Sequence, residues 1–233
     1  MRRIVFCVLW AVLWGPHISP FARAQSSASQ QFWPALNFHK SVSTFSRFSL
    51  EARQTRENQT GEDAQIGAFL DLYVKPLIKL QSTALLSSDT SKPRLLQLRA
   101  GYQYLRSTDN PPENRIVLAA APRLPLVLGM VGNNRNRVDL RFISGQFSWR
   151  YRNRFMVERS FAIGAHDFTP YARAEAFYDT RYEKWSRATC SAGATFALQK
   201  HVEVEAYFEH QNDSSSVPNR QINALSLGVN LFY

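Results

Sequence analysis

Cysteine, histidine and long apolar runs are scarce in this sequence, and each scarcity excludes a class of protein. The 233 residues include only two cysteines and five histidines. Without Cys and His pairs at ligand spacing, no metal site is expected, and the sequence implies no cofactor. After residue 15 no apolar run reaches the 18 or so residues that a membrane-spanning helix needs. A helical transporter or channel is therefore excluded.

The remaining composition is that of one folded domain. Apolar residues make up 45% of the chain and aromatic residues 13%, which excludes a disordered tail. The mean hydropathy of −0.30 is typical of a soluble protein. A transmembrane β-barrel gives a similar average, because its strands alternate apolar and polar residues.

The first 24 residues have the three parts of a secretory signal peptide. Met1-Arg2-Arg3 is basic, Ile4–Trp14 is apolar, and Ala22-Arg23-Ala24 puts small residues at the two positions that a signal peptidase reads. The apolar block is too short to anchor the chain across about 30 Å of hydrocarbon. We therefore expect a signal peptide over 1–24, a flexible lead-in over 25–32 and one domain over 33–233. The mature chain would retain only Cys190, so no intramolecular disulfide is expected.

The chain is basic, and arginine supplies most of the positive charge. The 28 basic side chains exceed the 18 acidic ones by 10, and loss of Arg2, Arg3 and Arg23 leaves 25 against 18, a net charge of +7. Such an exported chain could meet nucleic acid, anionic lipid or acidic polysaccharide. The arginines alternate with apolar residues instead of lining a groove with stacking aromatics, so no nucleic-acid partner is expected.

Alternation with a period of two dominates the sequence from residue 45 to the end. In Arg137–Phe142, for example, one set of alternate residues is charged and the other is Val, Leu and Phe. A β-strand separates these sets onto two faces, whereas a helix would mix them. Candidate strands are 33–41, 45–54, 66–75, 78–86, 94–105, 113–122, 136–143, 146–158, 168–178, 186–198, 201–211 and 221–233. No interior helix is expected.

The number of strands has two solutions. A single-chain bacterial barrel with both ends in the periplasm has an even number. Accepting both weaker candidates, 33–41 and 78–86, gives twelve strands, and leaving both outside the wall gives ten. We favour twelve, because 78–86 is otherwise an unexplained apolar stretch. The expected fold is all-β, an antiparallel transmembrane β-barrel.

The polar faces distinguish a barrel from a soluble β-sandwich, in which the same residues would form ion pairs on a solvated face. Arginine and glutamate recur at successive positions of one face, as in Arg150, Arg152 and Arg154. Stacked guanidinium and carboxylate groups suit a narrow hydrated lumen, because the arginine fork bridges neighbouring carboxylates. The residues expected to line the lumen are Arg99, Arg115, Arg137, Asp139, Arg141, Arg150, Arg152, Arg154, Glu158, Arg173, Glu175, Arg187, Glu203, Glu205 and Glu209.

The last candidate strand carries a second membrane signal. Ser226, Gly228, Leu231 and the terminal Tyr233 follow the spacing of the C-terminal signal by which the bacterial barrel assembly machinery takes up its substrates. Aromatic residues also gather near candidate strand ends, as the interfacial girdles of a membrane barrel require. They include Trp33, Trp149, Tyr151, Tyr182 and Trp185.

Several short motifs resemble an uncharacterised family of bacterial outer-membrane barrels, the domain-of-unknown-function family numbered 2490. They are Gly101-Tyr102-Gln103-Tyr104, Glu113-Asn114-Arg115, Arg150-Tyr151-Arg152-Asn153-Arg154, Ala174-Glu175-Ala176-Phe177, and Arg187 followed by Gly193. The stretch 80–93 is longer than the usual connection of that family. The resemblance implies a barrel in the outer membrane and supplies no activity.

Two functions are compatible with these observations. The leading one is an outer-membrane barrel whose Arg/Glu-lined lumen is narrow or plugged by side chains, with a structural role or passive passage of small polar solutes. The alternative is an enzyme, a lipid A or phospholipid hydrolase that would use His210 and Ser214 with Glu209. That activity requires His210 at the membrane boundary and within about 3 Å of a serine hydroxyl.

The expected partners follow from the location. They are outer-membrane lipid, the barrel assembly machinery, and lipopolysaccharide bound by basic residues in or near the longer loops. Those residues are Arg56, Arg106, Arg181, Lys184 and Arg220.

Overall fold

A computed structural model describes residues 28–57, 62–74, 94–108, 110–164, 166–215 and 218–233. The described chain forms twelve β-strands and a single 3-10 turn, Val127–Gly129. No helix in these residues has the length and apolar character to cross a membrane. The strands are β1 (Ser29–Ser43), β2 (Ser46–Glu57), β3 (Glu62–Val74), β4 (Leu96–Ser107), β5 (Glu113–Pro125), β6 (Val131–Ile143), β7 (Gln146–Glu158), β8 (Phe161–Ile163), β9 (His166–Asp179), β10 (Lys184–Gln199), β11 (Val202–Asp213) and β12 (Arg220–Phe232).

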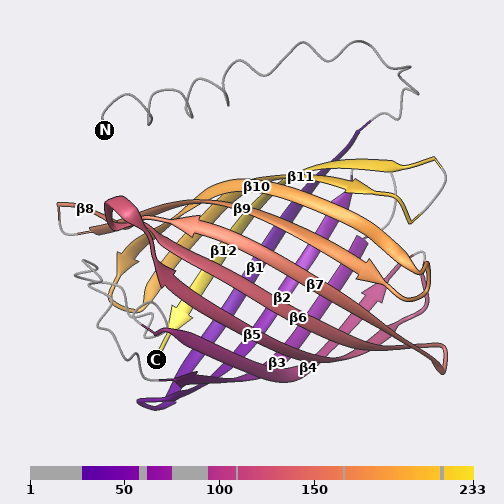
Figure 1. Ribbon diagram of the computed structural model, residues 1–233, viewed down its shortest axis with the longest axis horizontal. Helices are drawn as coiled ribbons and strands as arrows, with labels where there is room; N and C mark the ends of the chain where they lie inside the picture. The colour runs from indigo at the N-terminus through magenta and orange to yellow at the C-terminus, as the bar shows by residue number, and fades with distance from the viewer. Residues whose placement is uncertain (1–27, 58–61, 75–93, 109, 165, 216–217) are drawn as a thin grey trace.

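Eleven of these strands close into a barrel (Figure 1). The order around the wall is β1-β2-β3-β4-β5-β6-β7-β9-β10-β11-β12, and β12 returns to β1. The short β8 pairs only with the start of β9, through Phe161 opposite Phe168, and so lies outside the ring. The pairing of β1 with β12 leaves the wall without a free edge, so the backbone N–H and C=O groups of these two strands are hydrogen-bonded.

The closing seam is parallel, whereas every other neighbouring pair in the wall is antiparallel. Its register runs from Ser29 opposite Ile222 to His39 opposite Phe232. An odd number of strands requires such a seam. When strands alternate in direction, the first and the last of an odd number run in the same direction and can pair only in parallel. The start of β1 and the end of β12 therefore lie at opposite ends of the barrel.

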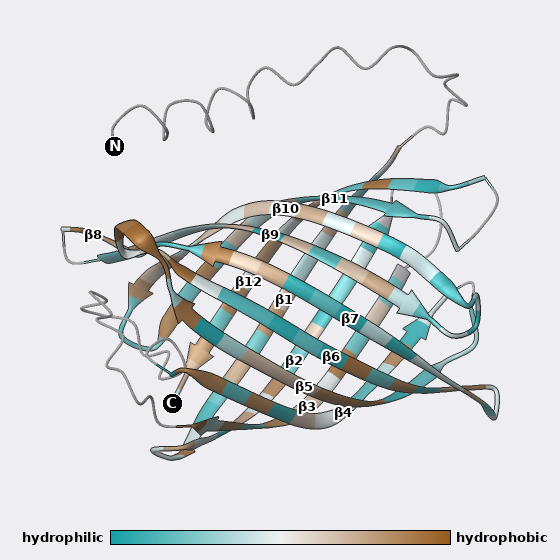
Figure 2. Cartoon of the chain, viewed as in Figure 1, coloured by the Kyte–Doolittle hydropathy of each residue, from teal (hydrophilic) through white to brown (hydrophobic). Residues whose placement is uncertain are grey.

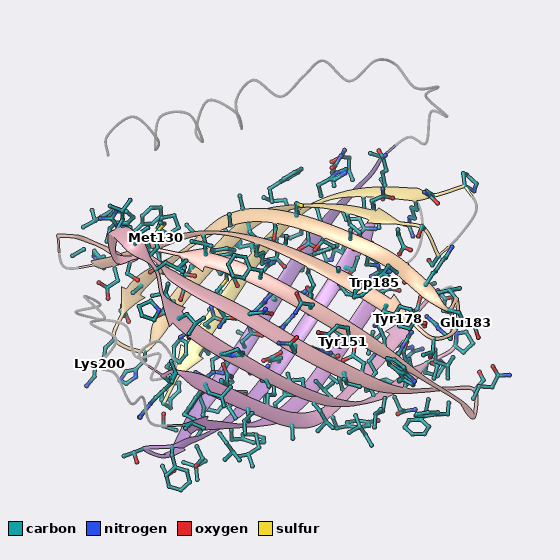
Figure 3. The ribbon with its side chains drawn as sticks, in the orientation of Figure 1. Met130, Tyr151, Tyr178, Glu183, Trp185 and Lys200 are labelled. Carbon is teal, nitrogen blue, oxygen red and sulfur yellow. The ribbon has the colours of Figure 1, made fainter. Side chains whose placement is uncertain are left out.

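Two ends of the barrel can be named from these connections. The Glu183 end holds the start of β1 and the connecting residues 108, 110–112, 144–145, 180–183, 214–215 and 218–219. The Lys200 end holds the connecting residues 44–45, 126–130, 159–164 and 200–201 and the end of β12. Figure 3 shows Glu183 at one end and Lys200 with Met130 at the other. At the Glu183 end, Ser144 and Gly145 both have positive φ, +50° and +79°. This is the two-residue hairpin geometry that follows the twist of the strands.

The strands divide into an exposed apolar face and a buried polar face. Leu36, Ile66, Leu118 and Leu227 are among many large apolar side chains that are exposed on the outer surface. The alternate residues point inward and are largely Arg, Asp, Glu, Ser and Thr. Figure 2 shows the hydrophilic stretches along the middle of β6 and β7. The interior thus carries the charge that a soluble protein would keep on its surface.

The structure corrects the strand count and the start of the first strand. The wall has eleven strands, neither twelve nor ten, and the parallel seam is the reason that parity failed. The stretch 78–86 lies outside the described residues, and β3 and β4 pair directly with each other. The first strand begins at Ser29, within the expected lead-in 25–32, and pairs over 29–39 with β12. Residues 1–24 lie outside the described part of the chain.

Candidate functional site

A charge network on the interior of β2, β3 and β4 is centred on Asp71. Its carboxylate has no exposed side-chain surface and accepts hydrogen bonds from Arg99 Nε at 2.6 Å and from Ser49 Oγ at 2.9 Å. Arg47 Nε lies 3.3 Å from the same carboxylate on its other side. Arg99 also forms an ion pair with Glu51 on β2. Each buried charge of this network thus has an opposite charge beside it, as burial requires.

A second network joins β5, β6 and β9 near the Glu183 end. Glu113 accepts hydrogen bonds from Arg115 and from Arg141. Arg141 reaches past β7 to Asp179, with Nη1 at 2.7 Å from Oδ2. Arg181 also donates to Asp179, from Nη2 at 3.0 Å. The network thus links β6 with β9 on the inner side of the intervening strand β7.

The interior of β6 and β7 carries a group of arginines that we call the arginine cluster, defined as Arg135, Arg137, Arg150, Arg152 and Arg154. Two carboxylates, those of Asp139 and Glu175, form ion pairs with arginines of this cluster. Glu175 lies 2.9 Å from Arg135 Nη2 and 3.0 Å from Arg152 Nε. Asp139, with no exposed side-chain surface, pairs with Arg137 and lies 3.6 Å from Arg150. The cluster is the most basic part of the described interior.

Acidic side chains gather on β11, three strands further around the wall from β7. Glu203, Glu209 and Asp213 are buried on its inner face, and this strand contains no lysine or arginine. Arg173 on β9 reaches Glu209 at 3.4 Å, and Arg187 on β10 binds Asp213. Positive charge on β6 and β7 thus faces negative charge on β11, with paired residues between them.

An apolar cluster crosses the interior beside these charges. It consists of Trp33, Tyr171, Tyr207, Ile222 and Ala224, with Met156 packed against it. These residues come from β1, β7, β9, β11 and β12, which together span almost half of the ring. The Arg173 guanidinium stacks on the Tyr207 ring at 4.1 Å. The cluster narrows the interior at this level.

All fifteen residues expected to line the lumen lie on the inner face of their strands. Their side chains are buried or half-buried, and every one of them except Arg154 and Glu203 has a charged partner within 4 Å. Glu203 also makes an interaction. Trp33 was expected in an interfacial girdle, which is wrong, because its ring is buried in the apolar cluster.

Several interior charges escaped the sequence analysis. Arg135 lay just before the expected strand 136–143, and Glu113 began its strand, so neither was assigned a face. Asp71 and Asp179 each lie two residues from a buried residue of the same strand. Strict alternation along β3 and β9 therefore predicts that both side chains point inward. The sequence could not show which charges pair, because partners such as Arg135 on β6 and Glu175 on β9 have the strand β7 between them.

The expected hydrolase residues are not assembled as that activity requires. His210 is exposed on the outer face, and its Nδ1 lies 2.8 Å from Asn223 Oδ1. Ser214 Oγ instead donates to the Ser186 carbonyl at 3.2 Å. Glu209 points to the opposite side of the wall, where it contacts Arg173. The residue directly opposite His210 on β10 is Cys190, which is free and exposed.

The remaining predicted positions are on the outer face, in the seam or in the connections. The Tyr178 ring packs on Trp149 and on Trp185, each at a centroid distance of 5.8 Å, and Trp185 packs on Tyr151 at 6.2 Å. Figure 3 labels Tyr151, Tyr178 and Trp185. Tyr182 is exposed in the connection 180–183. In the last strand, Ser226 is buried and donates to the Trp33 carbonyl, Gly228 faces Ala35, and Tyr233 stacks on His201 at 5.4 Å.

The basic residues of the connections differ in whether they have hydrogen-bond partners. Of the basic residues expected to bind lipopolysaccharide, Arg181 donates to Asp179 and Arg56 to Gln54, while Arg106, Lys184 and Arg220 are exposed. No group of three His, Cys, Asp or Glu residues in the described ranges could hold a metal ion.

Comparison with known proteins gives one family and one distant structure. The chain matches the family described as "Protein of unknown function (DUF2490)" over residues 30–222. No curated protein matches it. A solved structure titled "Bacterial polysaccharide outer membrane secretin" shares 8% identity and a TM-score of 0.46, over 77% of this chain and 62% of that one. The described barrel thus spans less than two thirds of that chain, and by its match over most of its length this protein belongs to the DUF2490 family.

Proposed function

We propose that this protein is a bacterial outer-membrane β-barrel whose interior is closed by its own side chains. One observation carries the proposal, the inversion of polarity between the two faces of the wall. Large apolar side chains cover the outside, while arginine–carboxylate networks fill the inside. An apolar surface of this extent would aggregate in water, whereas lipid solvates it. Export through the expected signal peptide and assembly by the barrel machinery are consistent with that location.

The dimensions of the ring favour a closed interior. Eleven strands spaced about 4.8 Å apart and tilted by about 40° give a backbone radius of about 11 Å. Long side chains from both walls fill most of that width. The apolar cluster lies across it at one level, and at another the Arg141–Asp179 pair connects β6 with β9 on the inner side of β7. A structural or solute-binding role therefore fits better than free passage.

Single-channel recording tests the closed interior. We expect the folded protein in planar bilayers to show no stable open step at moderate voltage. Tyr207→Ala shortens a side chain in the middle of the apolar cluster and should introduce small current steps. Phe208→Ala is the matched control, because Phe208 is the exposed neighbour on the same strand. Regular open steps in the unmodified protein would show that the interior is an open channel.

A second candidate, hydrolysis of lipid esters, is favoured by one row of side chains. Cys190, His210 and Asn223 lie directly opposite one another across β10, β11 and β12, on the outer face near the Glu183 end. A thiol, an imidazole and an amide that orients the imidazole are the residue types of nucleophilic acyl transfer. Here Cys190 would replace Ser214 as the nucleophile.

Lipid analysis separates this candidate from the first. If the row is catalytic, Cys190→Ala and His210→Ala should each abolish deacylation of outer-membrane phospholipid or lipid A, while Ser214→Ala should retain it. Unchanged lipid products on deletion of the whole protein would exclude the hydrolase and leave the closed barrel unaffected.

A further inference from the structure

The arginine cluster holds more positive charge than its carboxylates neutralise. Four of its five guanidinium groups form ion pairs, all of them with Asp139 or Glu175, so the five positive charges exceed these two negative charges by three. The strand register also puts Arg135 directly opposite Arg154. Like charges in such positions destabilise a sheet. The arrangement is therefore unfavourable for folding unless something else occupies the cluster.

Arg154 is the residue whose hydrogen-bonding capacity is left unused. It has no ion pair or hydrogen bond with any residue in the described ranges, and its Nε is buried. Glu175 is its direct neighbour on β9, but that carboxylate is already held by Arg135 and Arg152. Arg150 is nearly as poorly satisfied, because its Nε is also unpartnered and its closest carboxylate oxygen is 3.6 Å away.

We propose that the arginine cluster binds the oxyanion, a carboxylate or a phosphate, of a small solute. Glu175 shows how the cluster holds such a group, because Arg152 grips its two oxygens from Nε at 3.0 Å and from Nη2 at 3.1 Å. The planar guanidinium fork matches both carboxylate and phosphate in this way. The unpartnered Nε of Arg154 is left as a donor for one further oxyanion.

The side chains next to the arginine cluster indicate that the rest of the ligand is apolar. Met156 is the next inward residue after Arg154 on β7, and it packs against the apolar cluster. The ligand would therefore lay its charged group against arginine and its body against Met156 and the aromatic rings. The inference rests on the proposed closed barrel, because side chains that exclude bulk water strengthen the attraction between the arginines and an oxyanion.

Titration of the purified, folded protein in detergent micelles tests the inference. Succinate and inorganic phosphate serve as probes, with chloride at equal ionic strength as the reference. We expect saturable binding by calorimetry and a higher melting temperature with at least one probe. Arg154→Gln should weaken that binding by about tenfold or more, since it removes charge-assisted hydrogen bonds. Without any probe, the same variant should melt at the wild-type temperature or above it, because the repulsion from Arg135 is gone.

Arg47→Gln is the matched control, because it removes an interior arginine from the opposite wall, five strands from β7. It should bind the probe with wild-type affinity once its folded state is verified by heat-dependent gel mobility. Binding of succinate alone assigns a carboxylate solute, and binding of phosphate alone assigns a phosphate. Three results would overturn the inference: no saturable binding of either probe, an equal response to chloride, or unaltered affinity in Arg154→Gln. None of these affects the proposed barrel, which gel mobility and bilayer recording test separately.

Discussion

Asp71 carries a negative charge in a position without solvent, and four donors hold it there. Arg47, Arg99, Ser49 and Gln97 all point at its two oxygens. Asp71→Asn would put an amide NH2 against these donors and leave two guanidinium groups undercompensated. We expect a loss of about 3 kcal/mol in the free energy of unfolding, measured by denaturant titration in lipid vesicles. Asp63→Asn, at an exposed position of the same strand, should change it little, and equal effects of the two substitutions would contradict the buried network.

Two interior glycines differ in the room that they leave for a side chain. A Cβ on Gly193 would lie 2.3 Å from Tyr207 Cβ and 2.5 Å from the Ala206 carbonyl oxygen, whereas a Cβ on Gly228 would have no neighbour closer than 3.8 Å. Gly193→Ala should therefore destabilise the barrel by about 1–3 kcal/mol, and Gly228→Ala should be close to neutral. Thermal unfolding of the two variants compares them directly. A neutral Gly193→Ala would show that Tyr207 does not lie on this glycine.

At the scale of the strand, the parallel seam is the least expected feature. In its register Ala35 lies opposite Gly228, with the Ala35 Cβ 3.8 Å from a Cβ built on that glycine. This is the usual separation in a disulfide. Ala35→Cys with Gly228→Cys, in a background lacking Cys7 and Cys190, should form a disulfide under mild oxidation, seen as altered mobility on a non-reducing gel.

The control pair moves one cysteine along the seam. Ala224 lies opposite Gln31, so Ala35→Cys with Ala224→Cys separates the thiols by about 13 Å along the strand. That pair should remain reduced. Oxidation of the control pair instead of the test pair would mean that β1 and β12 meet in another register.

Alternation along the chain predicted the strands well but not how they close. The strand 146–158 was predicted with the bounds that the structure has, because charged and apolar residues alternate there without a break. The count of strands failed, because it assumed that both ends of the chain lie on the same side of the membrane, and no residue pattern reports a parallel seam. Of the arginine cluster, Arg137, Arg150, Arg152 and Arg154 were predicted as lining, whereas Arg135 was not. The pairing of Arg135 with Glu175 across β7 depends on side-chain reach.

At the scale of the whole molecule, charge is separated across the interior and excluded from the outside. The arginine cluster on β6 and β7 faces the acidic residues of β11, and networks of paired charges connect the two. The outer surface, by contrast, presents leucine, isoleucine and aromatic side chains between polar ends. Both the closed interior and the proposed oxyanion site depend on this single arrangement.

Spin labels placed one at a time along β7 of the protein in liposomes test that arrangement most directly. With Cys190 replaced, labels at positions 147, 149, 151 and 155 should be accessible to oxygen dissolved in the lipid, because their side chains lie on the outer face. Labels at 150, 152 and 154 should be shielded from it. A period of two in accessibility is the predicted result. Lipid exposure at the three arginine positions, or equal accessibility of all seven positions to a water-soluble relaxant, would contradict a closed barrel with its charge inside.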